Sequence, residues 1–213
     1  MLGIVLRGLA TAGARVAAPA AGEVIGVQGG RVIATEAAKG MATIVLAKEV
    51  SKDITKQQRC NKCEPYQLGN KHQLERTMGN EVNTQYQLKI ANLSSYPLTF
   101  KASPPFLKTG NKKPTPTTQI QEWNVSGVSF DGLWPMECIL VEAKGRYAQF
   151  LEGKPIFMKR EIFKKMQAEA LSQKAVKDTF KSAKLSWYFY EQETKLFFDS
   201  MTGHLIQTIY MPL

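Results

Sequence analysis

Three ionisable residues in the middle of the sequence have types and spacing that suit metal-assisted chemistry on a phosphate. Asp131 lies between Phe130 and Gly132, and Glu142 and Lys144 follow it as a Glu-x-Lys. Mg²⁺ prefers oxygen ligands and often takes only one or two protein carboxylates, plus water and phosphate. We expect Asp131 and Glu142 to hold Mg²⁺ or Mn²⁺, and Lys144 to orient the attacking water or stabilise the transition state. Alternatively, Lys144 is a surface ion-pair partner, which would contribute little.

Two apolar runs position these residues. Residues 128–134 and 138–147 are predicted strands, and residues 135–137 are the turn between them. Because side chains alternate along a strand, Leu140, Glu142 and Lys144 share one face of the second strand. A symmetric hairpin pairs residues whose numbers sum to 273, which places Asp131 opposite Glu142. Like charges in that position weaken a strand pair, and a metal ion or a shared proton would remove the cost.

A long helix is predicted after the hairpin, at residues 159–184. Its apolar face collects five side chains, namely Ile162, Phe163, Met166, Ala170 and Phe180. Gln173 falls inside this face, and a buried Gln needs hydrogen-bond partners. It either points into the site, touching a ligating water, a phosphate or Glu142, or is satisfied by a loop carbonyl. Gln167 flanks the same face and is the alternative candidate.

The elements on either side complete a mixed α/β layout. A strand at 119–125 carries Glu122, a possible additional ligand. A helix at 79–93 begins with Glu81, which is either a ligand or a favourable charge at a helix N-terminus. Three further strands are predicted downstream, at 185–191, 195–200 and 204–211, with a turn at Gly203. We therefore expect a sheet that bears the motif and is flanked by helices.

These motifs resemble a known group of proteins. The layout and the Asp…Glu-x-Lys pattern resemble the PD-(D/E)xK restriction-endonuclease-like superfamily. More narrowly, the sequence over residues 57–213 resembles the fifth restriction-endonuclease-fold toxin family of polymorphic bacterial toxins. The resemblance rests on Glu122-Trp123, Phe130-Asp131-Gly132, Leu140-Val141-Glu142-Ala143-Lys144, Tyr147 and Phe150, with Cys60-Asn61-Lys62-Cys63 and Tyr86-Gln87 upstream. No Pro precedes Asp131, and that Pro is often absent in the superfamily.

The resemblance implies a restriction-endonuclease-like core and a DNA-cleaving antibacterial effector. Such an effector is secreted by a type VI or related system, with a delivery chaperone or spike protein as a possible partner. It acts in the target-cell cytoplasm, and a cognate immunity protein neutralises it in the producer. Asp131, Glu142 and Lys144 inherit the catalytic role, and Gln173 or Gln167 inherits the downstream Gln position. The alternatives are an RNase, or a non-catalytic or membrane-active toxin or binding module that keeps the fold.

The charge balance is compatible with a polyanionic partner. The sequence has 28 Lys and Arg against 18 Asp and Glu, a formal net charge of +10. The basic residues cluster in Lys101–Lys113, Lys154–Lys165 and Lys174–Lys184, where they could neutralise phosphates. They could equally be solvated faces, and net charge does not separate nucleic acid from an anionic membrane or an acidic immunity protein. Residues 101–118 are predicted to form a Pro/Thr/Lys-rich loop.

The N-terminal residues 1–56 have a different composition from the predicted nuclease domain at 57–213. They are rich in Ala, Gly and Val, and are predicted to form a helical arm broken near Pro19 and Gly26–Gly30. Charged residues interrupt every apolar run long enough to cross a bilayer, so no stable membrane insertion is expected. We interpret the arm as a packing segment on the nuclease or a surface for a delivery protein. A segment that helps to cross a target membrane is the third possibility.

Three cysteines leave the redox compartment open. Cys60 and Cys63 form a single C-x-x-C, and Cys138 lies in the predicted strand, before Glu142. A structural zinc site needs four ligands, and only His72 is near. A local Cys60–Cys63 disulfide or two free thiols is the favoured interpretation, and Cys138 is expected to be a small buried hydrophobe.

Overall fold

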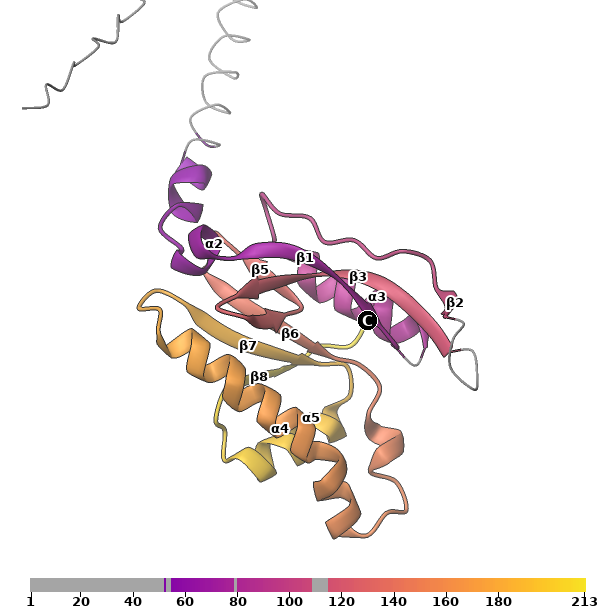
Figure 1. Cartoon of the computed structure of the whole chain (residues 1–213). Helices are drawn as coiled ribbons and strands as arrows, with labels where there is room; N and C mark the ends of the chain where they lie inside the picture. The colour runs from indigo at the N-terminus through magenta and orange to yellow at the C-terminus, as the bar shows by residue number, and fades with distance from the viewer. Residues whose placement is uncertain (1–51, 53–54, 79, 109–114) are drawn as a thin grey trace, which may run out of the picture. The chain divides into compact units, whose positions relative to one another are not determined.

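The computed structural model describes residues 52, 55–78, 80–108 and 115–213 (Figure 1). The predicted helical arm at 1–56 lies outside the described residues, apart from positions 52, 55 and 56. Among the described helices, none combines the length and the apolarity that a bilayer crossing requires.

The sheet that bears the motif is mixed and has four strands in the order β5-β6-β7-β8. The strands are β5 (Gly132–Trp134), β6 (Ile139–Lys144), β7 (Lys184–Phe189) and β8 (Gln207–Tyr210). β5 and β6 are an antiparallel hairpin, whereas β6, β7 and β8 run parallel. The helices α4 (Ile156–Asp178) and α5 (Gln192–Thr202) connect the parallel strands, because such strands need a crossover. The short 3₁₀ turn η1 (Ala148–Phe150) precedes α4.

A second sheet has four strands built around one long strand. Its members are β1 (Asn70–Arg76), β2 (Phe106–Lys108), β3 (Thr115–Val125) and β4 (Val128–Phe130). β3 pairs with β1 along one edge, and with β2 and β4 along the other. The helices α2 (Glu64–Leu68) and α3 (Glu81–Asn92) belong to this half of the chain, and residues 55–60 are also helical. β1 and α2 were not predicted from the sequence, and β2 interrupts the expected loop at 101–118.

The two faces of the motif sheet have different cores. Leu140, Trp187 and Phe189 pack in a large cluster with Phe163 of α4 and Phe198 of α5. A smaller cluster gathers side chains of the opposite strand face with α3, namely Tyr86, Ile90, Trp134, Val141 and Tyr188. Figure 1 shows α4 and α5 on one side of this sheet and α3 on the other. The predicted alternation is therefore observed, with Leu140, Glu142 and Lys144 on the α4 side.

The predicted strand at 195–200 is wrong, because these residues lie in α5. Thr194 and Phe198 are buried one helical turn apart, and Asp199 beside them is also buried, so this segment has one covered face. Gly203 is the left-handed C-cap of the helix, with φ 59°, rather than a turn between two strands. The predicted helix at 159–184 begins three residues earlier than expected and ends at Asp178, which leaves Phe180 buried beyond it.

Asp131 interrupts the predicted strand at 128–134. β4 ends at Phe130 and pairs with β3, and β5 begins at Gly132 and pairs with β6. Asp131 is therefore the single residue at which the chain passes from one sheet to the other. Gly132 is needed after it, because a Cβ at this position would lie 2.9 Å from the Cα of Ala91 in α3.

Candidate active site

Asp131 and Glu142 lie side by side and are both buried. The observed pairs Gly132–Val141, Leu133–Leu140 and Trp134–Ile139 all sum to 273, as predicted for a symmetric hairpin. Asp131 continues this register just outside the ladder. Its Oδ2 accepts a hydrogen bond of 2.7 Å from the backbone N–H of Ala143, the neighbour of Glu142. Exposed fractions are 7% for Asp131 and 4% for Glu142.

Burial raises the pKa of both carboxylates, because desolvation disfavours the ionised form. Desolvation, followed by the nearby charges of Glu142 and Glu122, raises the pKa of Asp131 well above its usual range. Desolvation also raises the pKa of Glu142, and the Lys144 ammonium only partly offsets this, which leaves a pKa of about 7. A cation bound between the two carboxylates would favour their ionised forms and so oppose this effect of burial.

Lys144 is fixed between two carboxylates and an aromatic ring. Its Nζ donates to Glu142 Oε1 at 2.7 Å and to Glu169 Oε2 at 2.5 Å. It also lies 4.4 Å from the ring centroid of Trp187. Burial alone would lower the pKa of Lys144, but Glu142 and Glu169 raise it well above its usual value. The side chain is thus a permanent, buried positive charge rather than a surface ion-pair partner.

Gln173 of α4 contacts the other carboxylate oxygen of Glu142, the one that Lys144 does not bind. Its Nε2 donates to Glu142 Oε2 at 2.7 Å and to the backbone carbonyl of Ser129 at 3.0 Å. Its Oε1 accepts from Trp187 Nε1 at 2.8 Å. The side chain is fully buried, so the amide has partners at both ends and one orientation. Both sequence alternatives, a contact with Glu142 and a bond to a backbone carbonyl, are present together.

These residues line a pocket of about 160 Å³. Six acidic or basic side chains line it: the acids Glu122, Asp131, Glu142 and Glu169, and the cations Arg76 and Lys144. With all six ionised the formal charge is −2, which a divalent cation would neutralise. Gly145 lets the pocket wall close, because a Cβ there would lie 2.2 Å from Asn83 Oδ1.

The donor set suits Mg²⁺ or Mn²⁺ better than a softer metal. Asp131 Oδ1 has no hydrogen-bond partner among the described residues, and each ionised carboxylate oxygen has more than one acceptor site. Within the described ranges, no cluster of three or more His, Cys, Asp or Glu side chains is arranged to hold a metal. Two carboxylates with water and phosphate are enough for Mg²⁺, which seldom uses an all-protein cage.

The other predicted candidates have different surroundings. Glu122 lines the pocket, but both of its oxygens accept from Arg76, at 2.9 and 2.8 Å. Glu81 is exposed at the start of α3 and accepts from Gln85, so it lies outside the pocket. Gln167 lies in a separate depression near the start of α4. Of the predicted residues, the structure brings together Asp131, Glu142, Lys144, Gln173 and Glu122, but not Glu81 or Gln167.

Three participants were missed from the sequence: Glu169, Trp187 and Arg76. Glu169 precedes Gln173 by one helical turn, so the i, i+4 rule could have placed both on the same face. Trp187 lies directly beside Glu142 in the parallel pairing of β6 with β7. Arg76 ends a strand that was not predicted.

The lysine clusters do not line the pocket in the part of the chain that the structure describes. Several instead pair with acids on their own helix, such as Lys174 with Asp178 at 2.5 Å and Lys164 with Glu161. This supports the interpretation of these lysines as solvated faces.

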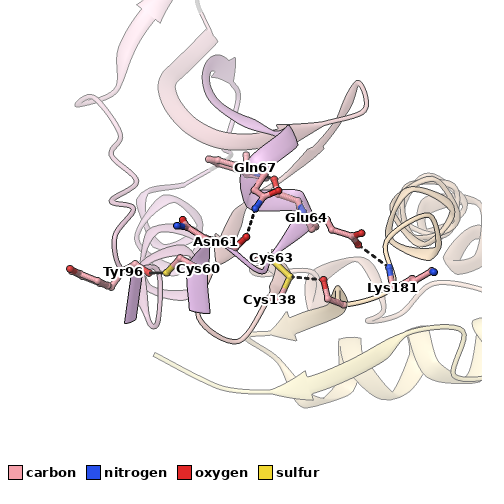
Figure 2. The surroundings of a disulfide bond; sticks show 11 residues. Cys60, Asn61, Cys63, Glu64, Gln67, Tyr96, Cys138 and Lys181 are labelled. Atoms are coloured by element: carbon pink, nitrogen blue, oxygen red, sulfur yellow. Dashed lines mark hydrogen bonds between the residues drawn. A yellow bond between two sulfur atoms is a disulfide. The ribbon is translucent and has the colours of Figure 1, made fainter. Parts of the chain in front are cut away.

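The predicted cysteine pairing is wrong. Figure 2 shows a disulfide between Cys63 and Cys138, which are 75 residues apart in sequence. Cys60 is a free, buried thiol whose Sγ lies 3.8 Å from the backbone carbonyl of Tyr96. Cys138 is therefore not merely a buried hydrophobe. The disulfide ties the segment before α2 to the turn that leads into β6, the strand of Glu142 and Lys144.

Comparison with known families identifies one match. Residues 108–192 match the family model described as restriction endonuclease fold toxin 5, which confirms the resemblance predicted from the motifs. The match runs from the end of β2 to the start of α5 and includes Asp131, Glu142, Lys144 and Gln173. The segment is thus related to toxins with a restriction endonuclease fold, which implies a toxin nuclease domain. No curated protein matches the sequence.

Proposed function

We propose, from the premise that residues 108–192 match a toxin family with a restriction endonuclease fold, that the protein is a metal-dependent nuclease toxin that cleaves DNA. The observation that carries the proposal is the buried pair of Asp131 and Glu142, with Lys144 held beside Glu142 at 2.7 Å. Two desolvated carboxylates and a fixed ammonium in a shared pocket suit cation-assisted hydrolysis of a phosphodiester.

Asp131 and Glu142 would hold the cation, Mg²⁺ or Mn²⁺. When bound, it would acidify a water molecule and offset the charge that develops on the phosphate. Gln173 keeps Glu142 in position, since its own amide is held by Trp187 and Ser129. Lys144 has three N–H donors, and Glu142 and Glu169 take two of them. The third is available to orient the attacking water or to stabilise the transition state.

The proposal includes a biological setting, which the similarity to the toxin family supports. The protein is an antibacterial effector of a type VI or related secretion system, delivered with a chaperone or a spike protein. It acts on DNA in the target-cell cytoplasm, and a cognate immunity protein blocks it in the producer. The net charge of +10 favours a polyanionic substrate and also an acidic inhibitor.

The test is cleavage of plasmid DNA by the purified full chain. We expect degradation with Mg²⁺ or Mn²⁺ and none with EDTA. Glu142→Ala should abolish cleavage and toxicity on expression in bacteria. Glu81→Ala is the matched control, because it removes a carboxylate outside the pocket, and it should remain active.

Each outcome has a defined meaning. Intact plasmid after incubation of the wild type with either metal would refute the DNase proposal, and degradation of RNA in a parallel reaction would identify an RNase. Undiminished killing by the Glu142→Ala variant would show that toxicity has another source, such as the N-terminal arm.

A further inference from the structure

Arg76 is a second cation in the pocket, and it lies outside the segment that matches the family. It is the last residue of β1, an edge strand of the second sheet. Its side chain is 46% exposed, whereas the side chain of its partner Glu122 is only 4% exposed. Glu122 is therefore buried, whereas Arg76 lines the pocket and is partly exposed to solvent.

The pair fixes the direction of the guanidinium. Nε donates to Glu122 Oε1 at 2.9 Å and Nη2 donates to Glu122 Oε2 at 2.8 Å, a bidentate contact along one edge. Glu122 Oε1 also accepts from Gln87 Nε2 at 3.5 Å, so the carboxylate is held from a second side. The opposite edge of the guanidinium, which carries Nη1 and the second Nη2 hydrogen, has no partner among the described residues. Of five N–H donors, about three remain for a ligand.

Binding of a phosphate in this acidic pocket would require a cation with free N–H donors, such as the Arg76 guanidinium. Four acids line the pocket and would repel a phosphodiester, even when two of them are offset by a bound cation. Lys144 cannot supply much additional attraction, because two carboxylates already take two of its three donors. Arg76 has a planar edge with parallel N–H groups, which matches the geometry of two phosphate oxygens.

We infer that Arg76 binds a non-bridging phosphate oxygen of the nucleic-acid substrate, and that Glu122 is the positioning residue that presents its free edge. This inference rests on the proposed nuclease function and adds a substrate contact to it. Glu122 is then a support for the phosphate site and not an additional metal ligand.

Arg76 could instead serve only to neutralise the buried charge of Glu122. A double variant that removes both charges separates this role from phosphate binding. Removing Arg76 alone leaves Glu122 buried without its partner, which would destabilise the protein. The variant Arg76→Gln/Glu122→Gln removes both charges and keeps amides that can hydrogen-bond each other. Lys71→Gln, on the same strand but outside the pocket, is the matched control for loss of one positive charge.

Cleavage of a short fluorescent duplex by the full chain is measured over a range of salt concentrations. For the double variant we expect KM to rise about tenfold, as for loss of a phosphate contact worth about 1.4 kcal/mol. The slope of log(kcat/KM) against log[salt] should become shallower by about one unit. The kcat should change much less than KM, and Lys71→Gln should have the wild-type KM. Arg76→Lys, which keeps the charge but loses the planar fork, should have an intermediate KM.

Failure of the inference differs from failure of the proposed function. A double variant with the wild-type KM and salt slope would overturn the role of Arg76 while the nuclease proposal stands. If the double variant does not fold, as judged by its urea midpoint, a wild-type KM for Arg76→Lys would overturn the role equally. A wild type that cleaves neither DNA nor RNA would overturn both.

Discussion

The buried carboxylates predict that the metal-free protein loses stability as the pH rises. The pKa of Glu142 is raised from 4.5 to about 7 in the folded protein, so between these values the folded state binds more protons than the unfolded chain. At about 1.4 kcal/mol per pH unit, the contribution of Glu142 is about 3 kcal/mol. It is present in full below about pH 4.5 and is lost above about pH 7.

Other titrating groups in the pocket determine the pH range in which the free energy of unfolding should be compared. Asp131 acts in the same direction, because its pKa is also raised. Glu169 acts in the opposite direction: burial raises its pKa, but Lys144, together with Glu142 and Arg76, lowers it overall. The contribution of Glu169 is present above its unfolded pKa and is lost only in acid. A comparison of about pH 5 with about pH 8 therefore isolates the two raised carboxylates.

The assay is urea unfolding in EDTA at the two pH values. We expect the wild type to be less stable at the higher pH by about 3 kcal/mol from Glu142, with Asp131 adding to this loss. The matched variant Glu142→Gln lacks one titrating group, so its stability should change less, although burial of Asp131 keeps part of the pH dependence. Adding Mg²⁺ or Mn²⁺ at 100 times its dissociation constant should restore about 2.7 kcal/mol to the wild type at the higher pH. Little restoration is expected at the lower pH, because the carboxylates are then protonated.

Two results would refute this reasoning. One is a wild type whose free energy of unfolding in EDTA is equal at both pH values, since desolvation of Glu142 would then have no thermodynamic effect. The other is equal stabilisation of the wild type and the Glu142→Gln variant by metal, since the cation would then bind elsewhere.

Three further predictions concern the groups that hold the site. Gln173→Leu leaves the indole N–H of Trp187 and the backbone carbonyl of Ser129 unpaired, and it should lower the free energy of unfolding by about 2–4 kcal/mol. In the same urea titration, the control Gln167→Ala, outside the pocket, should change this free energy by less than about 0.5 kcal/mol. Cys138→Ser opens a disulfide that spans 75 residues and should cost about 4 kcal/mol. Cys60→Ala should keep the sensitivity of stability to reductant, and loss of that sensitivity would contradict the pairing. Lys144→Met should abolish cleavage and raise the pKa of Glu142, so that stabilisation by Mn²⁺ needs a higher pH than in the wild type.

The parts of the fold that local rules control were predicted well. The hairpin register depends on a short turn and on alternation, so the sum of 273 and the faces of Leu140 and Glu142 were accessible from the sequence. The long helix was predicted from its 3.6-residue period, which also placed Gln173 on the buried face. The contact of Gln173 with Glu142 was one of two alternatives, and its geometry needed the structure.

The parts that depend on topology were not predicted. Residues 195–200 are rich in aromatic residues and too few to reveal a helical period, so β-propensity dominated the prediction. They are helical because β7 and β8 run parallel and need a crossover. β1 has a single apolar residue, Leu74, between polar neighbours, so its alternation gives little signal for the strand that ends at Arg76. The Cys63–Cys138 bond joins distant segments, which spacing alone does not reveal.

The two halves of the motif are therefore positioned by different physical means. Regular alternation along β6 places Glu142 and Lys144 on one face, and this arrangement needs only the strand itself. Asp131 instead depends on a break between two strands, held by buried Phe130 on one side and by close packing of Gly132 against Ala91 on the other. Because Ala91 belongs to α3, the position of that helix bears on Asp131, and α3 also packs against Val141 of β6. The separation of the two carboxylates thus depends on the packing of α3 as well as on the hairpin, whose Ala143 N–H donates to Asp131 Oδ2.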